Sequence, residues 1–165
     1  MERPKFIKKQ IFYDSRGSFS PLSLNIEDKT WVQSNISVNP KKFTLRGLHF
    51  QKNIFDQAKL VKVISGKVLD FVIDIRPLSA YNGQITFFEM SEGDEVIIPR
   101  GFAHGFITLE ENSIVQYLVD NEYQPDSEGV KVWTDYPEIL EKITLLDSEF
   151  DVNKITIAQK DLIEK

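Results

Sequence analysis

Apolar residues recur at every second position through much of this chain, in short runs separated by turn residues. Residues 59–75 contain two such runs around Ser65-Gly66, a dipeptide that predicts a tight hairpin turn. Residues 84–99 and 106–118 repeat this arrangement of strand, polar turn and strand, and residues 30–37 also alternate. Short strands with Gly, Asn and Asp in the turns are typical of a β-sandwich or barrel and argue against βαβ units. We therefore expect an all-β fold.

Helix is predicted only near the C-terminus, around Pro137–Leu146 and again near the last residues. The chain has 165 residues, a length that suits one domain, and 41% of them are hydrophobic, including twelve Phe that can fill a core. No internal repeat or linker divides the sequence. The sequence thus predicts one β-rich domain over residues 1–165 with a short, partly helical C-terminal tail.

Charge and cysteine content exclude several classes of function. Twenty Lys and Arg residues against 25 Asp and Glu give a net charge of −5, which disfavours nucleic acid as a partner. The chain contains no cysteine, so disulfides, thiol catalysis and thiolate metal ligands are excluded. Residues 1–10 are charged and lack the apolar core of a secretory signal, and no apolar run is long enough to cross a bilayer. We expect a cytoplasmic protein with no membrane partner.

Two histidines, His49 and His104, stand in sequence contexts that point to a site. His104 follows a glycine and Pro99-x-Gly101 at spacings that resemble the second motif of the cupin superfamily, with Thr108 where that motif ends in Asn. In a small barrel, the proline and glycine would turn the chain so that the next strand directs the imidazole into the lumen. We predict that His104 faces a cavity; the alternative is a buried core histidine.

His49 lies in the segment Arg46–Gln51, where alternation places His49 and Gln51 on one face of a strand. Metal-binding cupins carry a second histidine at the position that Gln51 occupies here. Two imidazoles and one amide are a poor ligand set for zinc, iron or manganese, and the chain has no third His and no Cys. We therefore predict no metal, and a metal-dependent cupin isomerase or oxygenase is the disfavoured alternative.

A longer series of segments identifies a family. They occur in one order over nearly the whole chain: Asp14–Phe19, Gln33–Ser37, Arg46–Gln51, Gln57–Val61, Val72–Arg76, Ile98–Phe106, Tyr117, Tyr123–Glu128 and Ile157–Asp161. Together they resemble the dTDP-4-dehydrorhamnose 3,5-epimerase family, a metal-free branch of the cupins. The resemblance implies a cupin jelly roll, a nucleotide-sugar substrate (a dTDP-sugar), no cofactor, and a homodimer in which N-terminal strands are exchanged.

The reaction implied by the resemblance is base catalysis on a nucleotide-linked 4-keto-6-deoxyhexose. Protons on C3 and C5 are acidic because each carbon adjoins the C4 ketone, and removing one gives an enolate. The chemistry requires a base, an acid on the other face of the ring and a donor at the enolate oxygen. The resemblance assigns His49 as the base, Tyr117 as the proton donor and Lys59 as the cation beside the oxyanion. Asp161 would orient His49, with Asp151 as the rival if the tail aligns differently.

Other residues match substrate-binding positions of the family. His104 would hydrogen-bond the sugar or the oxyanion, and Tyr123 would line the sugar pocket. The remaining matches are Arg16, Arg46 and Lys160 for the nucleotide or its pyrophosphate, Gln33, Asn35 and Glu128 along the cleft, and Gln51 on the face of His49. Without the family match, each of these would more often be a surface charge, a core aromatic residue or a strand-edge amide.

Two departures from the family bear on specificity. Pro21 stands where the family usually has a Glu, in a region implied to contact the base or ribose, and Ile157-Ala158-Gln159 replaces Leu-Ser-x. We expect changed specificity rather than lost catalysis. Two alternatives stay open: an enzyme that inverts only C3 or only C5 of another nucleotide-linked keto-sugar, and a cupin that binds a sugar nucleotide without turnover. The implied exchange of strands would let Arg16 serve the partner's site.

Overall fold

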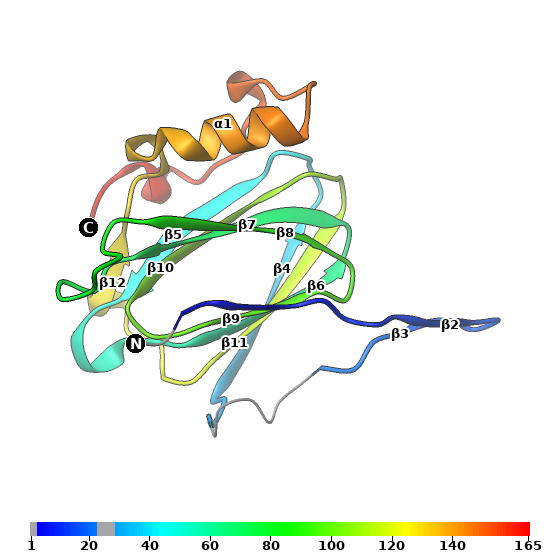
Figure 1. Cartoon of the computed structure of the whole chain (residues 1–165), viewed down its shortest axis with the longest axis horizontal. Coiled ribbons are helices and arrows are strands. Elements are labelled where there is room, and N and C mark those ends of the chain that lie inside the picture. Colours follow the sequence, from blue (N-terminus) through cyan, green and yellow to red (C-terminus); the bar gives the residue numbers. More distant parts are fainter. Residues whose placement is uncertain (1–2, 23–28) are drawn as a thin grey trace.

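A computed structural model describes residues 3–22 and 29–165 of the chain. Its strands form two five-stranded sheets and a separate two-stranded hairpin (Figure 1). The first sheet has the order β1 (Lys5–Ile7), β9 (Glu95–Ile98), β6 (Lys59–Ser65), β11 (Ser113–Val119) and β4 (Gln33–Asn39). The second has the order β12 (Glu128–Val130), β5 (Leu45–Gln51), β10 (Phe102–Thr108), β7 (Lys67–Asp74) and β8 (Ile85–Ser91). The hairpin joins β2 (Phe12–Asp14) to β3 (Gly17–Phe19).

One core lies between the two sheets, and both supply its buried side chains. The first sheet contributes Val61, Val63, Val96, Ile98 and Val115, and the second contributes Val68, Val72, Met90, Phe102 and Phe106. Successive side chains of a strand point to opposite faces, so every second side chain of a strand enters this core. β7 and β10 are buried along nearly their whole length, because the other face of the second sheet is covered as well. The predicted all-β sandwich is confirmed.

The turns that resemble hairpin turns in the sequence carry the chain from one sheet to the other. β6 ends at Ser65 and β7 begins at Lys67, yet β6 pairs with β9 and β11 whereas β7 pairs with β8 and β10. The turns after β8 and β10 likewise lead from the second sheet to the first. The hairpin prediction at Ser65-Gly66 was wrong, because alternation determines which face of a strand is buried but not which strand lies beside it.

The outer face of the second sheet is covered by the helix α1 (Pro137–Leu146), as Figure 1 shows. Its first residue is proline, whose missing N–H costs nothing there, and Ile139 and Ile143 lie one turn apart and are fully buried. The predicted helix is confirmed with the same bounds. The predicted helix near the last residues is the 3₁₀ turn η5 (Gln159–Leu162). Among the described residues, no helix is long and apolar enough to cross a membrane.

Short 3₁₀ turns occupy several connections: η1 (Asn53–Phe55), η2 (Pro125–Ser127), η3 (Trp133–Asp135) and η4 (Val152–Lys154). At the other end of the chain, β1 pairs with β9, and the β2–β3 hairpin beyond it extends away from the sandwich (Figure 1). After the hairpin, Ser20 and Pro21 lie against the first sheet. There Nζ of Lys62 on β6 donates to the carbonyl oxygens of Ser20 (3.1 Å) and Pro21 (3.0 Å). This buried lysine fixes the place where the hairpin leaves the body.

Candidate active site

A cavity of 780 Å³ opens into the sandwich, and both sheets and the C-terminal tail line it. Most residues predicted for the site meet there: Gln33, Asn35, Arg46, His49, Lys59, His104, Tyr117, Tyr123, Glu128, Lys160 and Asp161. Several of these are far apart in the sequence, so the fold itself assembles the site. Gln51 and Arg16 do not line the cavity.

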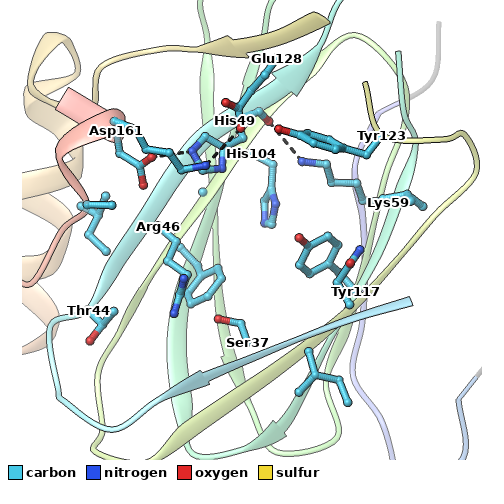
Figure 2. A pocket seen from close by; sticks show the side chains of 18 of the residues that line it. Ser37, Thr44, Arg46, His49, Lys59, His104, Tyr117, Tyr123, Glu128 and Asp161 are labelled. Carbon is cyan, nitrogen blue, oxygen red and sulfur yellow. Dashed lines mark hydrogen bonds and ion pairs between the residues drawn. The ribbon is translucent and has the colours of Figure 1, made fainter. Parts of the chain in front are cut away.

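His49 and Asp161 form a hydrogen-bonded pair at one side of the cavity (Figure 2). His49 lies on β5, and its Nε2 is 2.8 Å from Oδ1 of Asp161, whose other carboxylate oxygen accepts the backbone N–H of Gly47 at 3.3 Å. Burial is the largest influence and raises the pKa of Asp161, but the opposing influences of His49, the Gly47 N–H and Lys160 together leave the pKa below its usual value. An ionised, buried carboxylate therefore holds one ring nitrogen of the imidazole.

The strand carrying His49 needs a glycine at position 47. Gly47 has a φ of +112°, and a Cβ there would lie 2.6 Å from the Cα of Gly105 on the neighbouring strand β10. The two glycines thus let β5 and β10 approach closely where the register between them shifts. This approach also exposes the N–H of Gly47 to the carboxylate of Asp161.

Backbone hydrogen bonds on either side of Asp161 hold the C-terminal tail so that Asp161 lies in the cavity. The backbone of Thr156 pairs with that of Phe43 and Leu45, each at 2.9 Å, and Lys165 exchanges backbone hydrogen bonds with Val130. The rival residue Asp151 is used elsewhere, because its carboxylate accepts the backbone N–H of Asn153 at the start of η4. The structure thus places Asp161, and not Asp151, on His49.

A second histidine–carboxylate pair, His104 with Asp70, lies deeper in the fold. Nε2 of His104 is 2.7 Å from Oδ2 of Asp70, which is completely buried on the adjacent strand β7. Burial lowers the pKa of His104, and the charge of Asp70 opposes this only in part. The predicted turn at Pro99-x-Gly101 does direct His104 inward: β9 ends at Ile98, β10 begins at Phe102, and His104 lines the cavity.

Asp70 is the site residue that sequence reasoning missed. It stands in the run VLDFVID, where its neighbours are apolar and the whole strand reads as core. The available signal was the charge itself, because a carboxylate inside a buried strand requires a partner. The sequence contains only two imidazoles that could supply one.

Lys59 is a nearly buried cation close to His49. Its side chain is on β6, and Nζ donates to the backbone oxygen of His49 at 3.2 Å (Figure 2). Burial lowers the pKa of Lys59 to about 8, and the charge of Asp70 opposes the shift. At neutral pH most of the population therefore carries the positive charge, inside an environment where a charge acts strongly.

Tyr117 faces the cavity from the opposite sheet. It lies on β11, paired with Asn35 and Val61, whereas His49 lies on β5 of the second sheet. Figure 2 shows the phenol and the imidazole on opposite sides of the cavity, with His104 between them. Burial raises the pKa of Tyr117, so the hydroxyl keeps its proton at neutral pH. A ring held between these two groups would meet a base on one face and an acid on the other.

Polar and charged groups occupy the rest of the wall. Glu128 and Lys160 form an ion pair of 3.3 Å, and Gln33 donates to Asn35 at 2.7 Å. Burial raises the pKa of Glu128 most, but the hydrogen bond and charge of Lys160, together with His49 and Lys165, leave the pKa below its usual value. Arg46 is held through its Nε by Asn39 at 2.8 Å.

Gln51 and Arg16 lie outside this wall, and their substrate-binding roles stay predictions. Gln51 is buried, and its side-chain oxygen accepts the backbone N–H of Gln124 at 2.9 Å, so it anchors the loop that carries Tyr123. Arg16 is exposed on the β2–β3 hairpin and pairs with Asp14. In residues 3–22 and 29–165, no three His, Asp or Glu side chains gather in a way that could hold a metal ion.

An all-β sandwich with an acid and a base facing each other across a polar cavity defines a cupin-type isomerase. A family profile for dTDP-4-dehydrorhamnose 3,5-epimerase matches residues 2–163. The chain belongs to the dTDP-4-dehydrorhamnose 3,5-epimerase family.

Relatives and solved structures agree with the profile. The dTDP-4-dehydrorhamnose 3,5-epimerase of Salmonella typhimurium is 40% identical over 138 residues, which cover 78% of this chain and 75% of the relative. That of Neisseria gonorrhoeae is 39% identical over 139 residues, 79% of this chain but only 42% of the relative. The match therefore spans less than half of the Neisseria protein.

Among solved structures, the Bacillus anthracis epimerase with TDP and pyrophosphate bound has a TM-score of 0.82 and 32% identity, over 98% of this chain and 93% of that one. A Legionella pneumophila 3,5-epimerase in complex with dTDP-4-keto-L-rhamnose has a TM-score of 0.78 and 32% identity, over 96% and 84%. The cupin jelly roll and the family predicted from the sequence are confirmed.

Proposed function

We propose that this chain inverts C3 and C5 of a dTDP-linked 4-keto-6-deoxyhexose by proton transfer alone. The observation that carries the proposal is the opposition of His49 and Tyr117 across one cavity. Family membership and the titles of the related structures support the substrate class. A deoxysugar biosynthetic role follows from that substrate.

His49 acts as the base. Asp161 accepts a hydrogen bond from the N–H of Nε2, which leaves the lone pair of the imidazole on Nδ1. Nδ1 removes the proton from C3 or C5, and the electron pair of the broken C–H bond moves into the enolate. The ionised carboxylate of Asp161 then stabilises the imidazolium that forms.

Tyr117 acts as the acid on the other face. Its O–H gives a proton to the same carbon from the opposite side, the enolate returns to the ketone, and the carbon is inverted. The imidazolium and the phenolate left behind regain their starting states by exchange of one proton with solvent. The raised pKa of Tyr117 makes the phenolate a strong base, so reprotonation of the phenol is favourable.

Lys59 stabilises the enolate oxygen, and Nδ1 of His104 accepts a hydrogen bond from a sugar hydroxyl. Lys59 supplies a positive charge in a buried setting, and His104, held by Asp70, supplies an oriented imidazole. The cation acts where charge develops in the transition state, which is why it accelerates the reaction rather than only binding the ketone.

Arg46 and Lys160 bind the pyrophosphate, and Gln33, Asn35, Tyr123 and Glu128 contact the sugar nucleotide. Their places along the cavity wall support this assignment. A dianionic linker requires such cations even on a protein with a net charge of −5.

We further propose a homodimer in which the β2–β3 hairpin reaches the partner's cavity. On this chain the hairpin stands away from the sandwich and exposes Phe12, Tyr13 and Phe19 (Figure 1). Ile36 and Val38, at 68% and 58% exposure on the edge strand β4, offer an apolar surface for the second copy. Arg16 would then serve the partner's site, and Arg16→Ala should weaken dTDP binding only if the protein is dimeric. The cytoplasmic location stays a prediction.

Incubation with dTDP-4-keto-6-deoxyglucose in D2O tests the proposed reaction. We expect deuterium at C3 and C5, read by mass spectrometry and NMR. Exchange at one carbon only would show a mono-epimerase, and no exchange in any nucleotide-linked keto-sugar would show a protein that only binds. Metal analysis of the same purified sample tests the metal-dependent alternative.

Tyr117→Phe separates the two halves of the mechanism. The variant keeps the base, so deuterium exchange should continue, but it lacks the acid, so completed inversion should fall about 100-fold or more. Exchange and inversion lost in equal measure would contradict the assignment of Tyr117 as the acid.

A further inference from the structure

Asn39 is a completely buried polar side chain at the end of β4 that the mechanism above does not use. Its Oδ1 accepts hydrogen bonds from Nε of Arg46 at 2.8 Å and from the hydroxyl of Ser37 at 3.2 Å. Its Nδ2 donates to the backbone oxygens of Ser37 and Ser113, both at 3.1 Å. A primary amide has two donor positions and a two-fold acceptor, so this network uses all of them.

The network permits only one orientation of the amide. Two backbone carbonyls take the two protons of Nδ2, so turning the group over would place its oxygen against two other oxygens. The oxygen of Asn39 must therefore face Arg46. Because the sheets fix the carbonyl of Ser113, opposite Asn39 in the β4–β11 register, this orientation is built into the fold.

The hydrogen bond to Asn39 uses only Nε of Arg46, the guanidinium nitrogen nearest the backbone, so the two Nη groups stay available for a ligand. These two groups form the fork that binds phosphates in a bidentate manner. Arg46 lines the cavity, and Figure 2 shows it at the same end as Ser37, away from Asp161 and Glu128. The arginine is long and flexible, so a fixed Nε removes much of its freedom before a ligand arrives.

We propose that Asn39 is a positioning residue that holds the guanidinium of Arg46 ready for the diphosphate of a nucleotide-linked substrate. The proposal rests on the proposed function, which places the pyrophosphate at Arg46. Asn39 touches neither the substrate nor the reacting carbons; it acts through Arg46 alone.

Calorimetric titration of the whole protein with dTDP tests the proposal. Asn39→Ala should raise Kd about tenfold, the effect of losing about 1.4 kcal/mol of preorganisation. Turnover at saturating substrate should stay within about twofold, so KM rises and kcat does not. Arg46→Ala should weaken binding at least as much, and adding Asn39→Ala to it should cost nothing further, because the two residues act as one unit.

Two further variants keep the test clear of folding effects. Ser34→Ala alters an exposed hydroxyl of the same strand, which contacts Gln116, and should leave Kd unchanged. Asn39→Ser keeps a polar group at the buried position but is too short to reach Nε of Arg46, so it should reproduce the tenfold loss even where the alanine variant does not fold.

The possible failures are distinguishable. A lower melting temperature with unchanged dTDP affinity in the Asn39 variants, while Arg46→Ala weakens binding, would make Asn39 merely structural and overturn the inference. Unchanged affinity in Arg46→Ala would instead overturn the nucleotide assignment in the proposed function.

Discussion

The cavity contains two histidine–carboxylate pairs of nearly equal length and very different surroundings. His49 and Asp161 are 2.8 Å apart, and the imidazole side chain keeps 29% of its surface exposed. His104 and Asp70 are 2.7 Å apart, with 7% and 0% exposure. The same two chemical groups therefore occupy a site that reaches solvent and a site that is closed to it.

Their connectivity differs as well. His104 and Asp70 belong to adjacent strands of one sheet, β10 and β7, so their contact forms with the sheet. His49 belongs to β5, but Asp161 comes from the tail. The comparison teaches that a histidine–carboxylate pair has no fixed role: the accessible imidazole can reach substrate and solvent, whereas burial favours the neutral form of the enclosed imidazole and the carboxylate fixes its orientation.

Breaking the accessible pair should have the largest effect on activity. His49→Ala removes the general base and should reduce solvent deuterium exchange into the keto-sugar about 1,000-fold or more, close to the upper range for acid–base catalysis. Binding of dTDP should persist within a few-fold. Exchange within about tenfold of the original rate would mean that another group is the base.

A smaller loss should follow Asp161→Asn, which keeps the shape but removes the charge that orients His49. We expect exchange to fall about 100-fold with a small change in melting temperature, since the amide oxygen can still accept the hydrogen bond from His49. Asp70→Asn makes the same change in the enclosed pair, where the larger effect should be on stability, a loss of about 1–3 kcal/mol of folding free energy, because the carboxylate is fully buried. Thermal unfolding and deuterium exchange measure both effects. Equal losses of stability and of exchange rate in the two variants would show that the two pairs have the same role.

The smallest effect is a change in pH dependence. Lys59 must be protonated to stabilise the enolate, and its pKa is about 8, so kcat/KM should fall as the pH rises through this value. The raised pKa of Tyr117 keeps that group out of this range. Because the charge of Asp70 supports the cation, Asp70→Asn should move the basic limb to lower pH, and Lys59→Met should abolish it. If kcat/KM of Lys59→Met still falls near pH 8, the titrating group is not Lys59.

The sequence predicted those parts of the molecule that local patterns encode. α1 was predictable at Pro137–Leu146, and the inward turn of His104 followed from Pro99 and Gly101. Strand pairing was not predictable in this way: the residues around Ser65-Gly66 have the same alternation whether the chain returns to its own sheet or crosses to the other.

The candidate site shows the same division. The family resemblance supplied His49, Lys59 and Tyr117, and the fold brings them to one cavity. The contact between His49 and Asp161 joins residues 112 positions apart, so no local pattern could choose it over Asp151. Asp70 was not predicted as a site residue, because its apolar neighbours give the segment the pattern of a core strand. Its partner His104 lies 34 positions away, so no local pattern connects the two.

The late position of Asp161 in the chain has a consequence for biosynthesis. A ribosome completes the strands of both sheets before it adds the tail, so His49, Lys59 and Tyr117 can gather around a cavity on a nascent polypeptide. The backbone bonds of Thr156 and Lys165 bring the carboxylate to the imidazole only afterwards. The part of the cavity wall that carries Lys160 and Asp161 is therefore the last to form.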